Sequence, residues 1–116
     1  MNANTAPDTN RRSAPRRQPK KASKFVCRRG KLGLGPNIAV ALLDVSENGI
    51  RLIAKTPLEP DTDMEIGLQP IGAHRPTLVI ARVMWCIPLA DGNHCVGARF
   101  EKLLPYAFLQ EVAHLV

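Results

Sequence analysis

The sequence predicts an all-β domain with a C-terminal helix, arranged as a six-stranded antiparallel β-barrel. Two patterns predict this fold: about six short apolar segments separated by turn residues, and a change to helical periodicity at the end of the chain. The 116 residues suffice for one domain with a modest core. A flat sheet of six short strands would expose its edges, and closing the sheet into a barrel plugged by the helix removes them.

The strand segments are bounded by turn residues. The clearest strand is 63–69, where apolar side chains alternate with polar or small ones. A hairpin is expected around Asn48–Gly49, because this pair is favoured where two consecutive residues adopt positive φ. Asp91–Gly92 marks a second hairpin turn. The expected strands are residues 24–29, 38–45, 50–54, 63–69, 77–87 and 94–100.

The remaining segments are a loop and a helix. The glycine-rich stretch 30–37 is expected to be a loop and is not a dinucleotide-binding motif, because no helix follows it. Pro105 suits the first turn of a helix, although Leu104 is a poor capping residue. The apolar residues on one face of this expected helix are Leu104, Phe108, Leu109, Val112 and Leu115.

Charge divides the chain into two parts. Residues 1–31 carry ten basic residues and one acid, a net +9, whereas the rest carries six basic residues and nine acids, a net −3. Residues 1–22 hold three prolines and few large apolar side chains, so we expect a flexible basic N-terminal arm there and a barrel with its helix in 23–116. The arm's partner is expected to be an anion: a nucleotide, a nucleic acid or a membrane surface.

Three cysteines, Cys27, Cys86 and Cys95, show no paired spacing, so we expect reduced thiols in a cytoplasmic protein. No apolar run approaches the roughly 20 residues that span a bilayer, which predicts no membrane insertion. The basic N-terminal segment is not followed by the apolar stretch of a signal peptide, so export is not expected.

The end of the second expected strand carries polar residues of interest. Asp44 and Ser46 are two residues apart, so their side chains project to the same face of the strand. A carboxylate and a hydroxyl would then lie side by side at the rim of the sheet. Turn chemistry alone could explain both, because such side chains often satisfy nearby backbone N–H groups.

Two motifs together resemble a known family. Arg12-x-x-x-Arg16 in the arm, followed by Asp44-x-Ser46-x-x-Gly49 inside an all-β pattern, resembles the PilZ family, whose signatures are RxxxR and D/N-x-S-x-x-G. The resemblance covers roughly residues 11–112, with family-like strand endings at 82–85 and 96–100. It implies a PilZ-like barrel that is a non-catalytic receptor for cyclic di-GMP. It also implies a clamp formed by Arg12 and Arg16 and a platform formed by Asp44, Ser46 and Gly49.

The chemistry of these residues suits a guanine dinucleotide. A guanidinium can donate two parallel hydrogen bonds to guanine O6 and N7 or to a phosphate. A carboxylate at Asp44 can accept from the N1–H and amine of guanine, and Gly49 would allow close approach of a ligand. Ordering about six arm residues costs roughly 1–2 kcal/mol each, and a charge-assisted hydrogen bond returns about 1.5–3 kcal/mol. We therefore expect a switch in which ligand holds the arm on the barrel and creates a surface for a protein effector.

Two other functions remain open. A small-barrel nucleic-acid binder could use the cationic arm, although one Trp, one Tyr and three Phe offer little stacking surface. A PilZ-like protein-interaction module would bind no nucleotide. An enzyme is not expected: Ser46 lacks a Gly-x-Ser-x-Gly context, and adjacent His94 and Cys95 point to opposite strand faces, which disfavours a metal site. No cofactor is expected. Trp85 is interpreted as a packing residue and Arg99 as an exposed charge that could add positive potential near the ligand.

Overall fold

The six expected strands and the C-terminal helix are present. The computed structural model describes residues 15–20 and 23–113. Every strand lies within one residue of its expected bounds at each end. The elements are β1 Lys24–Arg29, β2 Ala39–Val45, β3 Gly49–Ala54, β4 Asp63–Gln69, β5 Thr77–Pro88, β6 His94–Phe100 and α2 Tyr106–Val112.

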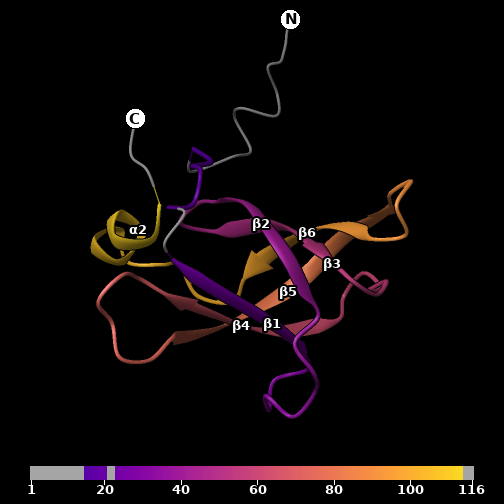
Figure 1. Ribbon diagram of the computed structural model, residues 1–116, viewed down its shortest axis with the longest axis horizontal. Coiled ribbons are helices and arrows are strands. Elements are labelled where there is room, and N and C mark those ends of the chain that lie inside the picture. Colours follow the sequence, from indigo (N-terminus) through magenta and orange to yellow (C-terminus); the bar gives the residue numbers. More distant parts are fainter. Residues whose placement is uncertain (1–14, 21–22, 114–116) are drawn as a thin grey trace, which may run out of the picture.

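The strands form one antiparallel sheet that curls into a nearly closed barrel (Figure 1). The strand order is β1-β4-β5-β6-β3-β2, so β1 and β2 are the two edges. These edges meet where the Ile38 N–H donates to the Cys27 carbonyl at 2.8 Å, and the Asn37 side chain accepts from the Cys27 N–H at 3.0 Å. The predicted six-stranded antiparallel barrel with a C-terminal helix is confirmed.

The core fills the barrel with the inward side chains of the strands, and α2 closes one end. Leu104, Leu109 and Val112 are buried, as the helical pattern predicted. Pro105 occupies the N-cap position, and no side chain caps the helix. Leu115 lies outside the described residues. The largest fully buried side chains include Ile50, Leu52, Met64, Ile66, Leu68 and Val83.

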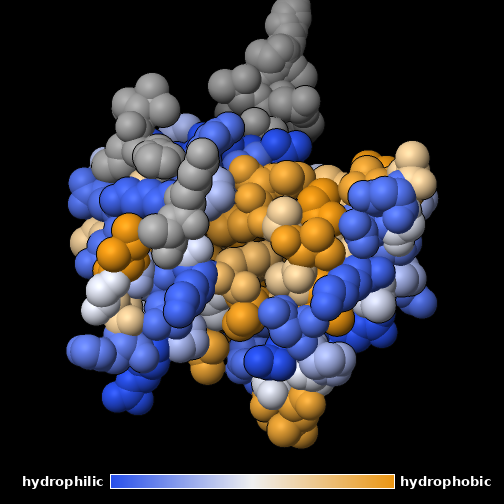
Figure 2. Space-filling view, viewed as in Figure 1, coloured by the Kyte–Doolittle hydropathy of each residue, from blue (hydrophilic) through white to orange (hydrophobic). Residues whose placement is uncertain are grey.

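The stretch 30–37 forms a loop between β1 and β2, as predicted. Figure 2 shows that this loop projects from the lower edge of the molecule and ends in an apolar tip. Leu32 and Leu34 there are 77% and 83% exposed. Arg28 donates to the Gly35 carbonyl at 2.9 Å and so ties the loop to β1.

Residues 15–20 connect the barrel to the helix. The Arg17 N–H donates to the Val45 carbonyl at 2.8 Å, and the Val45 N–H donates back to Arg17 at 2.9 Å. The Lys20 N–H then donates to the Val112 carbonyl at 2.9 Å. This part of the expected arm therefore lies against the end of β2 and the end of α2. Arg12 lies outside the described residues, and the boundary between arm and barrel at residue 22 stays a prediction.

The turn between β2 and β3 differs from its expected conformation. Neither Asn48 nor Gly49 has positive φ, so the prediction of two left-handed residues was wrong. Within the described residues, Asp61 is the sole non-glycine with positive φ, at 69°. Gly49 is instead the first residue of β3 and pairs with Arg99 of β6. The Ser46 N–H donates to the Gly49 carbonyl at 2.9 Å, which closes the turn.

Within ranges 15–20 and 23–113, none of the helices is long and apolar enough to span a membrane.

Candidate functional site

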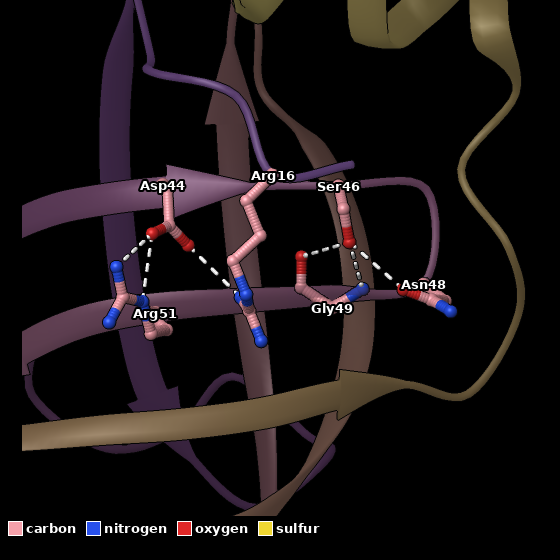
Figure 3. Close-up of polar contacts among 6 residues, drawn as sticks. All are labelled: Arg16, Asp44, Ser46, Asn48, Gly49 and Arg51. Atoms are coloured by element: carbon pink, nitrogen blue, oxygen red, sulfur yellow. Dashed lines mark hydrogen bonds and ion pairs between the residues drawn. The ribbon is translucent and has the colours of Figure 1, made fainter. Parts of the chain in front are cut away.

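The site is built around the carboxylate of Asp44, at the end of β2. Asp44 is buried, with 7% of the residue exposed. Its Oδ1 accepts from Nη1 of Arg16 at 3.0 Å. Its Oδ2 accepts from Nε of Arg51 at 2.8 Å and also from Nη2 of Arg51. Both oxygens of one buried carboxylate are thus held by arginines from two different parts of the chain (Figure 3).

Backbone pairing sets the position of Arg16. Arg17 forms an antiparallel bridge with Val45, the residue next to Asp44. Arg16 therefore lies beside the carboxylate, and its side chain is 31% exposed. The structure brings together Arg16 and Asp44, which the family resemblance assigned to the clamp and to the platform respectively.

Arg51 belongs to this site, although the sequence interpretation did not select it. It lies directly opposite Asp44 in the pairing of β2 with β3. The hydrogen bond to Asp44 raises the pKa of Arg51, against a smaller opposing effect of burial. The strand register was the signal that could have identified Arg51, because Asp44 and Arg51 flank the 46–49 turn and face the same side of the hairpin.

Ser46 holds the turn that follows Asp44. It is buried, with 2% exposed. Its hydroxyl accepts from the Gly49 N–H at 3.1 Å and donates to Oδ1 of Asn48 at 2.9 Å. The Gly49 carbonyl, at 3.3 Å, is a second acceptor for the same proton. The interpretation of Ser46 as a turn residue that satisfies a nearby backbone N–H is confirmed.

Two buried glycines beside the carboxylate allow close packing on the outer face of the sheet. A Cβ on Gly49 would lie 2.9 Å from the Ala98 carbonyl oxygen, so β6 approaches too closely for any other residue type. A Cβ on Gly97 would lie 2.2 Å from the Trp85 ring, so the indole lies directly against the Gly97 backbone. Trp85 is therefore a packing residue, as interpreted, and it covers a glycine as aromatic side chains do in sheets. Across the strands, Asp44, Arg51, Gly97 and Trp85 are successive neighbours.

The described residues contain no group of three or more His, Cys, Asp or Glu that could hold a metal ion. The groups that the site presents are the guanidiniums of Arg16 and Arg51 and the carboxylate of Asp44. Such groups can pair with the donor edge of a planar base and with an anionic group at the same time.

Comparisons with known proteins concern the fold and the family of the chain. Comparison with curated proteins gives no match. Among solved structures, the chain is similar to one described as the structure of the K. pneumonia MrkH-c-di-GMP complex, with a TM-score of 0.56 and 21% sequence identity. That similarity covers 87% of this chain and 48% of the MrkH chain, so this chain spans about half the length of that protein. The sequence profile described as PilZ domain matches residues 10–116. The chain belongs to the PilZ domain family.

Proposed function

We propose that this chain is a non-catalytic receptor domain for cyclic di-GMP, which binds through Arg16, Asp44 and Arg51 beside the Ser46–Gly49 turn. One observation carries the proposal: an arginine of the N-terminal segment and an arginine of β3 meet on a single buried carboxylate. Family membership and the similarity to a structure described with c-di-GMP support the identity of the ligand. Arg12, implied by the family motif, completes the proposed clamp.

Asp44 is suited to recognise guanine. The N1–H and exocyclic amine of guanine form a pair of parallel donors, as the N–H groups of a guanidinium do. Because both oxygens of Asp44 already accept from arginines, guanine would reach the carboxylate by replacing Arg16 at Oδ1. Arg51 would stay on Oδ2 and keep the carboxylate in place. Adenine offers no equivalent donor pair on that edge, so the carboxylate selects guanine.

Arg16 would then contact the ligand directly. Its guanidinium can donate two hydrogen bonds to O6 and N7 of guanine or to a phosphate. The neighbouring Arg17 stays paired with Val45, so Arg16 can move its side chain while its backbone remains on the barrel. A ligand that contacts Arg16 and Asp44 together has a higher affinity for the protein when the arm is paired with Val45 than when the arm has left the barrel. Binding of the ligand therefore favours the paired state.

The proposed output is a switch in the arm. Residues 17–20 connect the end of β2 to the end of α2 through backbone hydrogen bonds. Ligand that stabilises this connection would fix the surface formed by the arm and helix end, which a protein effector could then recognise. No reaction is proposed, because Ser46 uses its hydroxyl within its own turn. The free cysteines fit a reducing, cytoplasmic location.

Calorimetric titration tests the binding proposal. Cyclic di-GMP, GMP and single-stranded RNA are titrated at two salt concentrations into wild type, Arg16→Ala, Asp44→Ala and the control Arg75→Ala, which changes an exposed loop arginine. We expect selective binding of cyclic di-GMP that both site substitutions abolish and the control preserves. Binding of RNA that survives Asp44→Ala and weakens steeply with salt would instead identify a nucleic-acid binder.

Limited trypsin digestion tests the switch. Cleavage after Arg16 and Arg17 requires the arm to leave the barrel, because a protease needs an extended, accessible backbone. We expect saturating cyclic di-GMP to slow this cleavage in wild type and to leave it unchanged in Asp44→Ala. Equal cleavage rates with and without bound ligand would reject the switch and leave the binding proposal standing.

A further inference from the structure

A second cationic row crosses the outer face of the barrel next to the site. Gly49 of β3 is paired with Arg99 of β6, and Arg99 is paired with Arg82 of β5. The neighbours of Arg99 in the strand, Ala98 and Phe100, are buried in the core. Arg99 is exposed, and it therefore projects outward on the same face as Gly49.

The charges of this row are poorly balanced. Like charges directly opposite in an antiparallel pair are destabilising. Nε of Arg82 is 3.4 Å from Oδ1 of Asp63. The other oxygen of the same carboxylate, Oδ2, is 3.8 Å from Nζ of Lys31. The Arg99 side chain makes no hydrogen bond or ion pair with any residue in 15–20 or 23–113, although its backbone pairs with the neighbouring strands. The sheet thus pairs two arginines, of which Arg82 has a carboxylate within ion-pair distance and Arg99 has none among the described residues. An anion next to Arg99 would stabilise this arrangement.

The row borders the proposed binding site. The Cα of Arg99 is 4.0 Å from the point where a Cβ of Gly49 would lie. Arg51 is two residues beyond Gly49 on the same face of β3, about 6.6 Å along the strand. Figure 3 shows the guanidinium of Arg16 between Arg51 and Gly49. Arg99 therefore adds positive charge on the β6 side of the surface that Arg16 approaches from the β2 side.

Nearby acids define where an anion can lie. The surface depression lined by Arg82 and Arg99 also contains Asp61, Asp63 and Glu101. Asp63 is paired with Arg82 from β4, on the side away from β6. An anion would therefore lie towards Gly49, where Arg99 has no competing carboxylate opposite it.

We propose that Arg99, assisted by Arg82, forms a second anion subsite that binds a phosphodiester group next to Gly49. This inference rests on the proposed function and extends it to the β5–β6 side of the barrel. Cyclic di-GMP carries two phosphodiesters, so the group comes either from the dinucleotide that Asp44 holds or from a second dinucleotide beside it. Both sources present the same chemistry to Arg99.

Titration calorimetry with cyclic di-GMP on Arg99→Ala, Arg82→Ala, Arg99→Lys and the control Arg75→Ala tests this subsite. Losing one charge-assisted contact is expected to weaken binding by about tenfold to a hundredfold in Arg99→Ala. Arg82→Ala is expected to have a smaller effect, and Arg99→Lys to keep part of the affinity. Weaker binding at unchanged stoichiometry identifies a phosphodiester of the same dinucleotide, and a halved stoichiometry identifies a second one.

Thermal unfolding without ligand separates a binding role from a structural one. Because Arg99 and Arg82 repel each other, Arg99→Ala is expected to unfold at the same temperature as wild type or higher. Lower affinity combined with an undiminished unfolding temperature supports the subsite. If Arg99→Ala binds as wild type does while Asp44→Ala does not bind, the subsite is rejected and the proposed function stands. If wild type binds no cyclic di-GMP, both are rejected.

Discussion

Asp44 of β2 and Arg51 of β3 lie directly opposite each other, and Arg51 donates from both Nε and Nη2 to one carboxylate oxygen. This pairing fixes the orientation of a buried carboxylate and leaves its other oxygen facing Arg16. Removing the arginine from such a pair leaves a buried negative charge with fewer compensating hydrogen bonds, which is unfavourable. Arg51 therefore determines how Asp44 is presented to any ligand.

Arg51→Ala is expected to weaken binding of cyclic di-GMP by about tenfold or more, because the carboxylate loses the two hydrogen bonds that orient it. Arg51→Lys is expected to recover only part of the loss, since an ammonium cannot donate in the same forked geometry. Titration calorimetry measures both, with Arg75→Ala as the matched control. Wild-type affinity in Arg51→Ala would contradict this role.

The strands could be predicted from the sequence, and the partners of Asp44 could not. Apolar periodicity and turn residues locate strands because both depend on neighbours within a few residues. The contact between Arg51 and Asp44 depends on register, and the contact of Arg16 depends on a backbone bridge between residues far apart in the chain. The conformation at Asn48–Gly49 was mispredicted for the same reason. The glycine is required by the approach of β6 and not by the local turn.

Ser46→Ala is expected to lower the free energy of unfolding by about 1–3 kcal/mol, because it leaves the buried Gly49 N–H without its acceptor. Ser23→Ala is a matched control. The Ser23 hydroxyl is buried and has no hydrogen-bond partner within the described residues. Its removal is expected to leave stability unchanged or slightly higher. Urea unfolding measures both variants, and equal losses would contradict the turn-closing role of Ser46.

Gly49→Ala is expected to lower the free energy of unfolding by about 1–3 kcal/mol, because the new methyl would meet the Ala98 carbonyl at 2.9 Å, and a backbone atom in a paired strand cannot move away easily. The same shift would disturb the Ser46 turn and weaken ligand binding. Gly35→Ala is the control, since its Cβ would meet nothing closer than 3.9 Å. Gly35→Ala is expected to be neutral or mildly stabilising. If the two variants have the same free energy of unfolding in urea, the Ala98 carbonyl does not restrict the side chain at position 49.

The protein is expected to lose stability at alkaline pH because the Cys27 thiol is buried. The thiol is buried in β1 with its Sγ 3.4 Å from Sδ of Met64, and burial raises the pKa of Cys27 from 9.0 to about 12. Below pH 9 the folded and unfolded chains both keep the proton, so the full contribution to stability is present. Between pH 9 and 12 the unfolded chain loses the proton first, and the free energy of unfolding falls by about 1.4 kcal/mol per pH unit.

Urea unfolding of wild type and Cys27→Ala between pH 8 and 11 isolates this thiol from the other groups that titrate in the same range. Cys27→Ala is expected to be less stable than wild type at pH 8, because it removes a buried sulfur from the core. The difference between the two proteins is expected to shrink steadily above pH 9, since only wild type loses stability through this group. Stability profiles that stay parallel across this range would show that the Cys27 thiol ionises as easily in the folded barrel as in the unfolded chain.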